Sequence, residues 1–290
     1  MDLTLGIVGS GEPVGLVIAG VHGDEGPWGA MAIQKLLEDT PLEALKGTLR
    51  IVPNANPLAM WADKRNATSD NKDLNRAFPG NPDGSHTERL AAILSDVAID
   101  GVDVLIDLHG GGSWCVNSFV FSFPGGEELA GAFEAHFIVE AHERETTATG
   151  YARLRGARVV AVEMGGRSGD EESWAHSIAA SVRRALGLVG VFKPYSHGQE
   201  RNPVPASSTE VFTASRRGLL RPALKEDSIG RIVPGGTVLG WLLDPDTMDT
   251  LEEYVAPYPE TGILLLRPTL SVVEGGEMLY LVAVPRSSKG

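Results

Sequence analysis

The chain has 290 residues, of which 25 are Lys or Arg and 38 are Asp or Glu, so its formal net charge is −13. A chain of this length is expected to bury about 75% of the surface that its unfolded form exposes, so it needs no disulfide or structural metal to fold. The acidic balance argues against a nucleic-acid partner, which requires Lys and Arg against phosphates, and against docking on an anionic membrane.

The single cysteine, Cys115, rules out an intramolecular disulfide and fits a reducing compartment. Residues 1–10 contain no basic segment followed by a long apolar run, so no secretory signal is expected. The longest early apolar stretch, residues 15–21, is far shorter than the ~20 residues that span a bilayer. We therefore expect a cytoplasmic protein without a membrane partner.

The first two-thirds of the chain alternates short apolar runs with longer segments of helical period. This alternation predicts an α/β fold, with a mixed, mostly parallel sheet flanked by helices. The predicted strands are 15–19, 49–52, 103–108 and 158–162, and the predicted helices are 27–38, 87–99 and 173–188.

The pattern changes near residue 200. Residues 199–208 are polar, contain Pro203 and Pro205, and are predicted to form a linker. Beyond them the apolar runs are short and separated by Gly and Pro, which is typical of a small all-β module. We therefore predict two domains, residues 1–198 and 199–290.

His22 and Glu25 lie directly after the first predicted strand, where open α/β sheets bind ligands. An imidazole nitrogen and a carboxylate oxygen three residues apart can reach one cation, and these ligand types suit zinc. His109 ends a second predicted strand and enters a Gly-rich loop. Two ligands close in sequence plus one distant His form a catalytic zinc site with an open fourth position. A capped surface turn and a His bonded to backbone are the alternatives.

Glu163 follows four apolar residues of a predicted strand. A carboxylate there is costly unless it faces a polar cleft or a cation. Beside a metal-bound water it can accept a proton and return it to a leaving amine. The alternative is an acid that belongs to the start of the next helix. Arg65 and Arg76 lie in a polar segment and suit an anionic substrate and an oxyanion, with surface ion pairs as the alternative.

Together, these motifs resemble the zinc carboxypeptidase superfamily, specifically its succinylglutamate desuccinylase/aspartoacylase branch. The resemblance covers residues from about 14 to 190, and members of this branch also carry a β-rich C-terminal module. Here that module resembles a barrel-sandwich carrier domain. The matching segments are His22-Gly-Asp-Glu25, Asp73-Leu-Asn-Arg76-Ala-Phe-Pro-Gly80, Asp107-Leu-His109 and Glu163.

The resemblance implies one Zn²⁺ per chain, bound by His22, Glu25 and His109. It also implies that Asp73 orients His22 and that Glu163 is the general base and acid.

Three further roles follow from the same resemblance. Arg65 would polarise the scissile carbonyl and hold the oxyanion. Lys64 is the other candidate for that role, because residues 66–72 align loosely. Asn75 and Arg76 would bind the free carboxylate of the substrate.

These roles predict a zinc-dependent hydrolase that cleaves the amide bond of an N-acyl amino acid, a small-molecule substrate. The alternatives are a metallocarboxypeptidase acting on a peptide or cell-wall fragment, and a non-catalytic binding protein with this fold. The presence of His22, Glu25, His109 and Glu163 argues against the binding protein. The acyl group remains open, as does assembly into a homo-oligomer.

Overall fold

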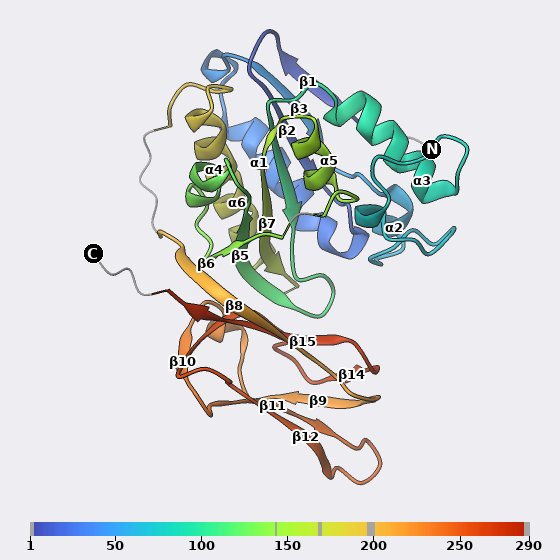
Figure 1. Cartoon of the computed structure of the whole chain (residues 1–290), viewed down its shortest axis with the longest axis vertical. Coiled ribbons are helices and arrows are strands. Elements are labelled where there is room, and N and C mark those ends of the chain that lie inside the picture. The colour runs from blue at the N-terminus through green and yellow to red at the C-terminus, as the bar shows by residue number, and fades with distance from the viewer. Residues whose placement is uncertain (1–2, 143, 168–169, 196–200, 287–290) are drawn as a thin grey trace.

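The computed structural model describes residues 3–142, 144–167, 170–195 and 201–286, and has a mixed α/β fold, as predicted (Figure 1). Within these residues, one eleven-stranded sheet continues from the helix-covered part of the molecule into the C-terminal strands. In order across the sheet, its strands are β1 (Gly6–Gly9), β3 (Thr48–Val52), β2 (Val14–Ala19), β4 (Val104–His109), β7 (Arg158–Gly166), β5 (Val116–Ser122), β6 (Phe137–Glu140), β8 (Val204–Thr213), β15 (Met278–Pro285), β13 (Glu260–Leu266) and β10 (Ile232–Pro234).

The strands that position the site are parallel. β3, β2, β4 and β7 are neighbours in this order, and all three pairings are parallel. β2 and β4 are almost completely buried, as expected for parallel strands that are covered on both faces. β5 then runs antiparallel to β7 and parallel to β6.

Helices cover both faces of these strands. Alternate residues of a strand point to opposite faces, so Val17 of β2 packs into one core and Leu16 and Ile18 pack into the other. The first core includes residues of α1 (Gly26–Asp39), α4 (Glu127–Gly131) and α6 (Glu171–Leu188). The second includes residues of α3 (His86–Ile93), of the π-helical turn Leu94–Ile99 and of α5 (Ala148–Leu154). α2 (Pro57–Trp61) is a short helix that packs beside the turn after β2.

The predicted strands correspond to β2, β3, β4 and β7, and the predicted helices to α1, α3 with its π-helical turn, and α6. The linker prediction is wrong from residue 204 onward, because these residues begin β8, which pairs with β6 and β15. Pro205 lacks an amide hydrogen, but its carbonyl still accepts a hydrogen bond from Arg286 N at 2.7 Å. The predicted boundary between residues 198 and 199 lies outside the described residues, and the division into two domains stays a prediction.

The C-terminal strands enclose a core of their own against a second sheet. The described part of this sheet has the order β12 (Thr250–Val255), β11 (Val238–Leu243), β9 (Gly218–Pro222) and β14 (Ser271–Val273). β13 also pairs with β5, so the C-terminal strands touch the helix-covered part directly. No helix in the described ranges has the length and apolar character needed to cross a bilayer.

Candidate active site

His22, Glu25 and His109 meet where β2 and β4 end. The two strands are parallel neighbours, with Ala19 opposite Leu108, so their carboxyl ends lie at the same edge of the sheet. His22 Nδ1 lies 3.0 Å from Glu25 Oε2, and His109 Nδ1 lies 2.9 Å from the same oxygen. One ligand atom from each residue falls within 4.8 Å of the others. The sequence placed these residues at strand ends, and the fold brings them together.

The turn that carries the first two ligands is fixed by close backbone packing. Residues Gly23–Glu25 form a single 3₁₀ turn between β2 and α1. A Cβ at Gly23 would lie 2.0 Å from the carbonyl carbon of Ala59, so no other residue fits there without moving α2. Asp24 N also donates a hydrogen bond to Lys64 O at 3.2 Å. This turn is therefore held against the segment that leads into Arg65.

Both imidazoles have a carboxylate on their outer nitrogen. His22 Nε2 lies 3.2 Å from Asp73 Oδ1, and His109 Nε2 lies 3.0 Å from Asp107 Oδ2. Asp107 is fully buried, and neither of its carboxylate oxygens has a well-aligned hydrogen-bond partner among the described residues. Carboxylates behind ligating imidazoles are a common feature of zinc sites, because they fix the ring orientation. The donor set of two imidazoles and one carboxylate therefore fits zinc.

The imidazoles and carboxylates of this cluster stabilise each other's charged forms. Burial lowers the pKa of both imidazoles, but the adjacent carboxylates outweigh it, so the pKa of His22 is raised and that of His109 is raised well above its ordinary value. Burial raises the pKa of Glu25, but the two imidazoles outweigh it and hold this pKa well below the usual range. Glu25 is thus an ionised carboxylate facing the point where the ligand atoms converge.

Arg65, and not Lys64, reaches the cluster. Its Nη1 lies 3.1 Å from Glu25 Oε1 and 3.2 Å from His22 Nδ1, and its Nη2 donates to Asp73 Oδ2 at 3.0 Å. The Lys64 side chain is exposed and does not line the cavity at the cluster. The Arg65 guanidinium is therefore a fixed positive charge beside the proposed metal ligands.

Asp73, Asn75 and Arg76 belong to one 3₁₀ turn. Asp73 caps it by accepting a hydrogen bond from Asn75 N at 2.8 Å. Despite burial, His22 and Arg65 hold the pKa of Asp73 below its ordinary range. Arg76 is exposed in the cavity wall, where Nη1 donates to the carbonyl of Asn75 at 2.6 Å. Within the described residues, Arg76 forms no ion pair.

Glu163 lies on β7, opposite His109 on β4 and opposite Phe119 on β5. Asn117 Nδ2 donates to Glu163 Oε2 at 2.9 Å. Loss of hydration raises the pKa of the Glu163 carboxyl to about 7, although His109 opposes this shift. A carboxyl with such a pKa can both accept and donate a proton near neutral pH.

Asn117 was not found by sequence reasoning. The signal that was available is a polar residue in a short strand that follows the Gly-rich loop after His109.

One cavity of about 630 Å³ is lined by most of these residues, namely His22, Glu25, Arg65, Asn75, Arg76, Asp107, His109, Asn117 and Glu163. Both parts of the molecule contribute to its walls. The residues contributed by the C-terminal strands and the loop after β13 are Thr209, Val211, Leu265, Arg267, Met278 and Leu281.

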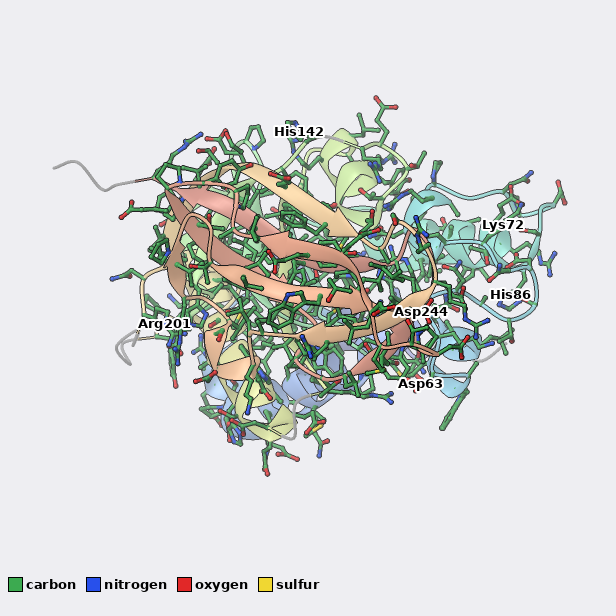
Figure 2. All side chains as sticks on the ribbon, turned by 90° about the horizontal axis from the view of Figure 1, so that it is seen from below. Asp63, Lys72, His86, His142, Arg201 and Asp244 are labelled. Carbon is green, nitrogen blue, oxygen red and sulfur yellow. The ribbon has the colours of Figure 1, made fainter. Side chains whose placement is uncertain are left out.

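A second cavity of about 600 Å³ lies elsewhere, between α6 and the 3₁₀ turn Glu226–Ser228. Arg201 lines this cavity and His142 lines the first, and Figure 2 shows the two side chains at different edges of the molecule. Among the described residues, the only cluster with metal-ligand spacing is that of His22, Glu25 and His109. We therefore take the first cavity as the candidate active site.

The model of the succinylglutamate desuccinylase/aspartoacylase catalytic domain matches residues 13–188. The chain belongs to this family. The match runs from β2 through α6 and includes every residue of the cluster described above.

Individual relatives cover different shares of the chain. Over 107 residues it is 43% identical to the N-alpha-acetyl-L-2,4-diaminobutyric acid deacetylase of Halomonas elongata. This stretch is 37% of the chain and 31% of that enzyme, so the chain spans about a third of the length of this curated relative.

Solved structures match nearly the whole chain. A succinylglutamate desuccinylase from a Silicibacter species has a TM-score of 0.83 at 23% identity, covering 97% of this chain and 88% of that one. A succinylglutamate desuccinylase/aspartoacylase from Rhodobacter sphaeroides has a TM-score of 0.82 at 25% identity, covering 99% and 90%. The arrangement of the helix-covered part and the C-terminal strands therefore recurs in other proteins of this fold.

Proposed function

We propose that the chain is a zinc-dependent hydrolase that cleaves the amide bond of an N-acyl amino acid. The observation that carries this proposal is the convergence of His22, Glu25 and His109 beside Glu163 in one cavity. Membership of the family and the deacetylase activity named for the Halomonas relative support it.

Zinc held by His22, Glu25 and His109 would supply an acidified water and a Lewis acid at the scissile carbonyl. Glu163 accepts the proton of the attacking water and returns it to the leaving amine. Asn117 holds one oxygen of this carboxylate, which leaves the other for proton transfer. Arg65 places its positive charge where the carbonyl oxygen becomes negative, and its contacts with Glu25 and Asp73 keep it there.

Asn75 and Arg76 are proposed to bind the free carboxylate of the amino acid. Arg76 lines the cavity, and its pKa is lowered by burial and by the neighbouring charges of Arg144 and Arg65. A substrate carboxylate would relieve this repulsion, and binding it fixes the amide relative to Glu163. The C-terminal strands close one side of the cavity, which favours a small substrate over a peptide or cell-wall fragment.

Metal content and amine release test this proposal together. Protein purified without added metal is expected to carry about one zinc per chain, and His109→Ala to lose it. Release of free amine from N-acetyl amino acids should stop on chelation and return with zinc. A chain that binds no zinc and shows no zinc-restored hydrolysis would instead be a non-catalytic binding protein, and hydrolysis of C-terminal peptide bonds alone would identify a carboxypeptidase.

A further inference from the structure

One face of β5 and of the loop after it carries a row of side chains into the cavity. Asn117, Phe119, Phe121 and Phe123 alternate along the chain, and all four line the cavity. Residues two apart in a strand share a face, so the row follows from the strand period. Phe119 and Phe121 meet edge to face, with ring centroids 5.1 Å apart. The row therefore begins with an amide and continues as an aromatic wall.

The row starts at the catalytic carboxylate and leads away from it. Phe119 lies opposite Glu163, and Phe121 lies opposite Ala161 two residues further along. At about 3.4 Å per residue, Phe121 lies about 7 Å beyond the level of Glu163 along the strand. Ala141 and Ala161 also line this part of the cavity and add apolar surface.

This aromatic wall lies on the side of the cavity that is proposed to hold the substrate carboxylate. Phe123 shares a core cluster with Ala148, and Phe121 packs against the same cluster. Ala148 N in turn donates to Asn75 Oδ1 at 3.0 Å. In an N-acyl amino acid, one carbon carries both the carboxylate and the side chain. A carboxylate held by Asn75 therefore brings the side chain to the same end of the cavity as Phe121 and Phe123.

The described residues that line the cavity beside this wall include no acid, so a cationic side chain would have no ion-pair partner there. Among the described residues, the acids that line the cavity are Asp24, Glu25, Asp107 and Glu163, and all belong to the metal end. Thr147 and Thr149 near the wall are uncharged. The cations that line the cavity at this end, Arg144 and His142, have exposed side chains whose charges water screens. The Arg153 guanidinium carbon lies over the face of the Phe123 ring, 5.8 Å from its centroid.

We propose that the amino-acid part of the substrate bears an aromatic or large aliphatic side chain, which packs against Phe121 and Phe123. This inference rests on the proposed amide hydrolysis and names its substrate class. The diaminobutyrate named for the Halomonas relative carries an amine in its side chain. Such an amine would meet no carboxylate on the aromatic wall.

The test compares kcat/KM for amine release by the zinc-loaded chain. The substrates are the N-acetyl derivatives of L-phenylalanine, L-leucine, L-aspartate, glycine and, at the α-amine, L-2,4-diaminobutyrate, together with N-succinyl-L-glutamate. The kcat/KM values for the phenylalanine and leucine compounds are expected to exceed those for the three compounds with a charged side chain by ~10-fold or more. This is the size of discrimination that an apolar pocket gives. A preference for any charged compound would overturn the inference and leave amide hydrolysis standing.

Variants locate the effect. Phe121→Ala is expected to lower kcat/KM for N-acetyl-L-phenylalanine about tenfold. It should leave kcat/KM for N-acetylglycine within about twofold of the unmodified chain. Phe121→Leu, which keeps an apolar side chain, should retain most of the activity. The matched control is Phe212→Ala, because Phe212 is also partly buried but packs against Tyr254 and not into the cavity. Equal losses for both substrates in Phe121→Ala would contradict a side-chain pocket.

A binding measurement separates this inference from the proposed reaction. If no N-acyl amino acid is hydrolysed, the proposed function fails, and calorimetric titration of the zinc-loaded Glu163→Gln chain decides the inference. Tighter binding of N-acetyl-L-phenylalanine than of N-acetyl-L-aspartate, lost on adding Phe121→Ala, would support the pocket. Equal binding of the two compounds would overturn it.

Discussion

The helix-covered parallel strands and the C-terminal strands both line the active-site cavity, but they contribute different side chains. The carboxyl ends of β2, β4 and β7 carry His22, His109 and Glu163, while β8, β13 and β15 contribute mostly apolar surface. The ionised groups on the first side are held by one another through short contacts. The comparison indicates that the parallel strands hold the charged groups of the cavity and that the C-terminal strands add a mostly apolar wall.

The largest effect is expected from Glu163, on the parallel side. Glu163→Gln keeps the shape of the side chain and its hydrogen bond to Asn117 but cannot accept a proton. We expect kcat to fall by about 10²–10⁴-fold with little change in substrate affinity, measured by steady-state kinetics and calorimetry. The control is Glu140→Gln, whose side chain is exposed on β6 and pairs with Arg286. Full activity in Glu163→Gln would remove Glu163 from the mechanism.

Arg65 and Lys64 provide the next comparison, between adjacent cations. Arg65→Met should lower kcat by about 10²–10³-fold, the usual loss for one oxyanion donor. Lys64→Met should leave kcat within about twofold of the unmodified chain, because the Lys64 side chain is exposed outside the cavity. Zinc content must be measured on both variants, since Arg65 also contacts Glu25. The assignment is wrong if Lys64→Met is the variant that loses turnover.

Arg267 tests the C-terminal side, where a structural role is expected. This buried guanidinium donates to Met278 O at 2.8 Å and to Glu277 Oε2 at 3.0 Å. Arg267→Met should reduce the free energy of unfolding by about 1–3 kcal/mol, because buried hydrogen bonds to a charged group are lost. Arg217→Met should change it by about 0.5 kcal/mol or less, since Arg217 and its partner Glu274 are exposed. Urea unfolding measures the change in the free energy of unfolding for both variants. Equal changes would contradict a structural role for Arg267.

The smallest effect concerns pH and the stability of the metal-free chain. Because the pKa of Glu163 is raised to about 7, the folded chain binds this proton more tightly than the unfolded chain does. The contribution of this bound proton to the free energy of unfolding is complete below the ordinary pKa of Glu, and it is lost as pH rises through 7. Relative to Glu163→Gln, the unmodified chain should therefore be less stable at pH 8 than at pH 5. Urea unfolding at both pH values measures this difference, and a constant difference would refute the raised pKa.

The parts of the fold that were predictable are those with long apolar runs. β2, β4 and β7 are buried on both faces, so their sequences are almost continuously apolar. β5 reads Val-Asn-Ser-Phe-Val-Phe-Ser and was not predicted, because its polar residues are buried against partners far away in the chain. Residues 204–208, the first half of β8, were predicted to belong to a linker because Pro205 and its neighbours resemble one. Its pairing with β15 joins segments about 70 residues apart, which no local pattern reveals.

The site residues also divide into those that local sequence can place and those that depend on long-range strand pairing. His22, Glu25, His109 and Glu163 follow predictable strands, so local sequence places them at strand ends. Parallel register then brings the strand ends together. Asn117 was missed because its role depends on β5 lying beside β7.

The close contact between Gly23 and Ala59 has a mechanical consequence. Together with the hydrogen bond from Asp24 N to Lys64 O, it joins the ligand turn and the arginine segment into one rigid piece. A displacement of the turn that carries His22 and Glu25 would therefore move the segment that carries Arg65 with it. New substrate preferences in this scaffold would have to arise by remodelling the aromatic row on β5 and the C-terminal strands, while this piece stays unchanged.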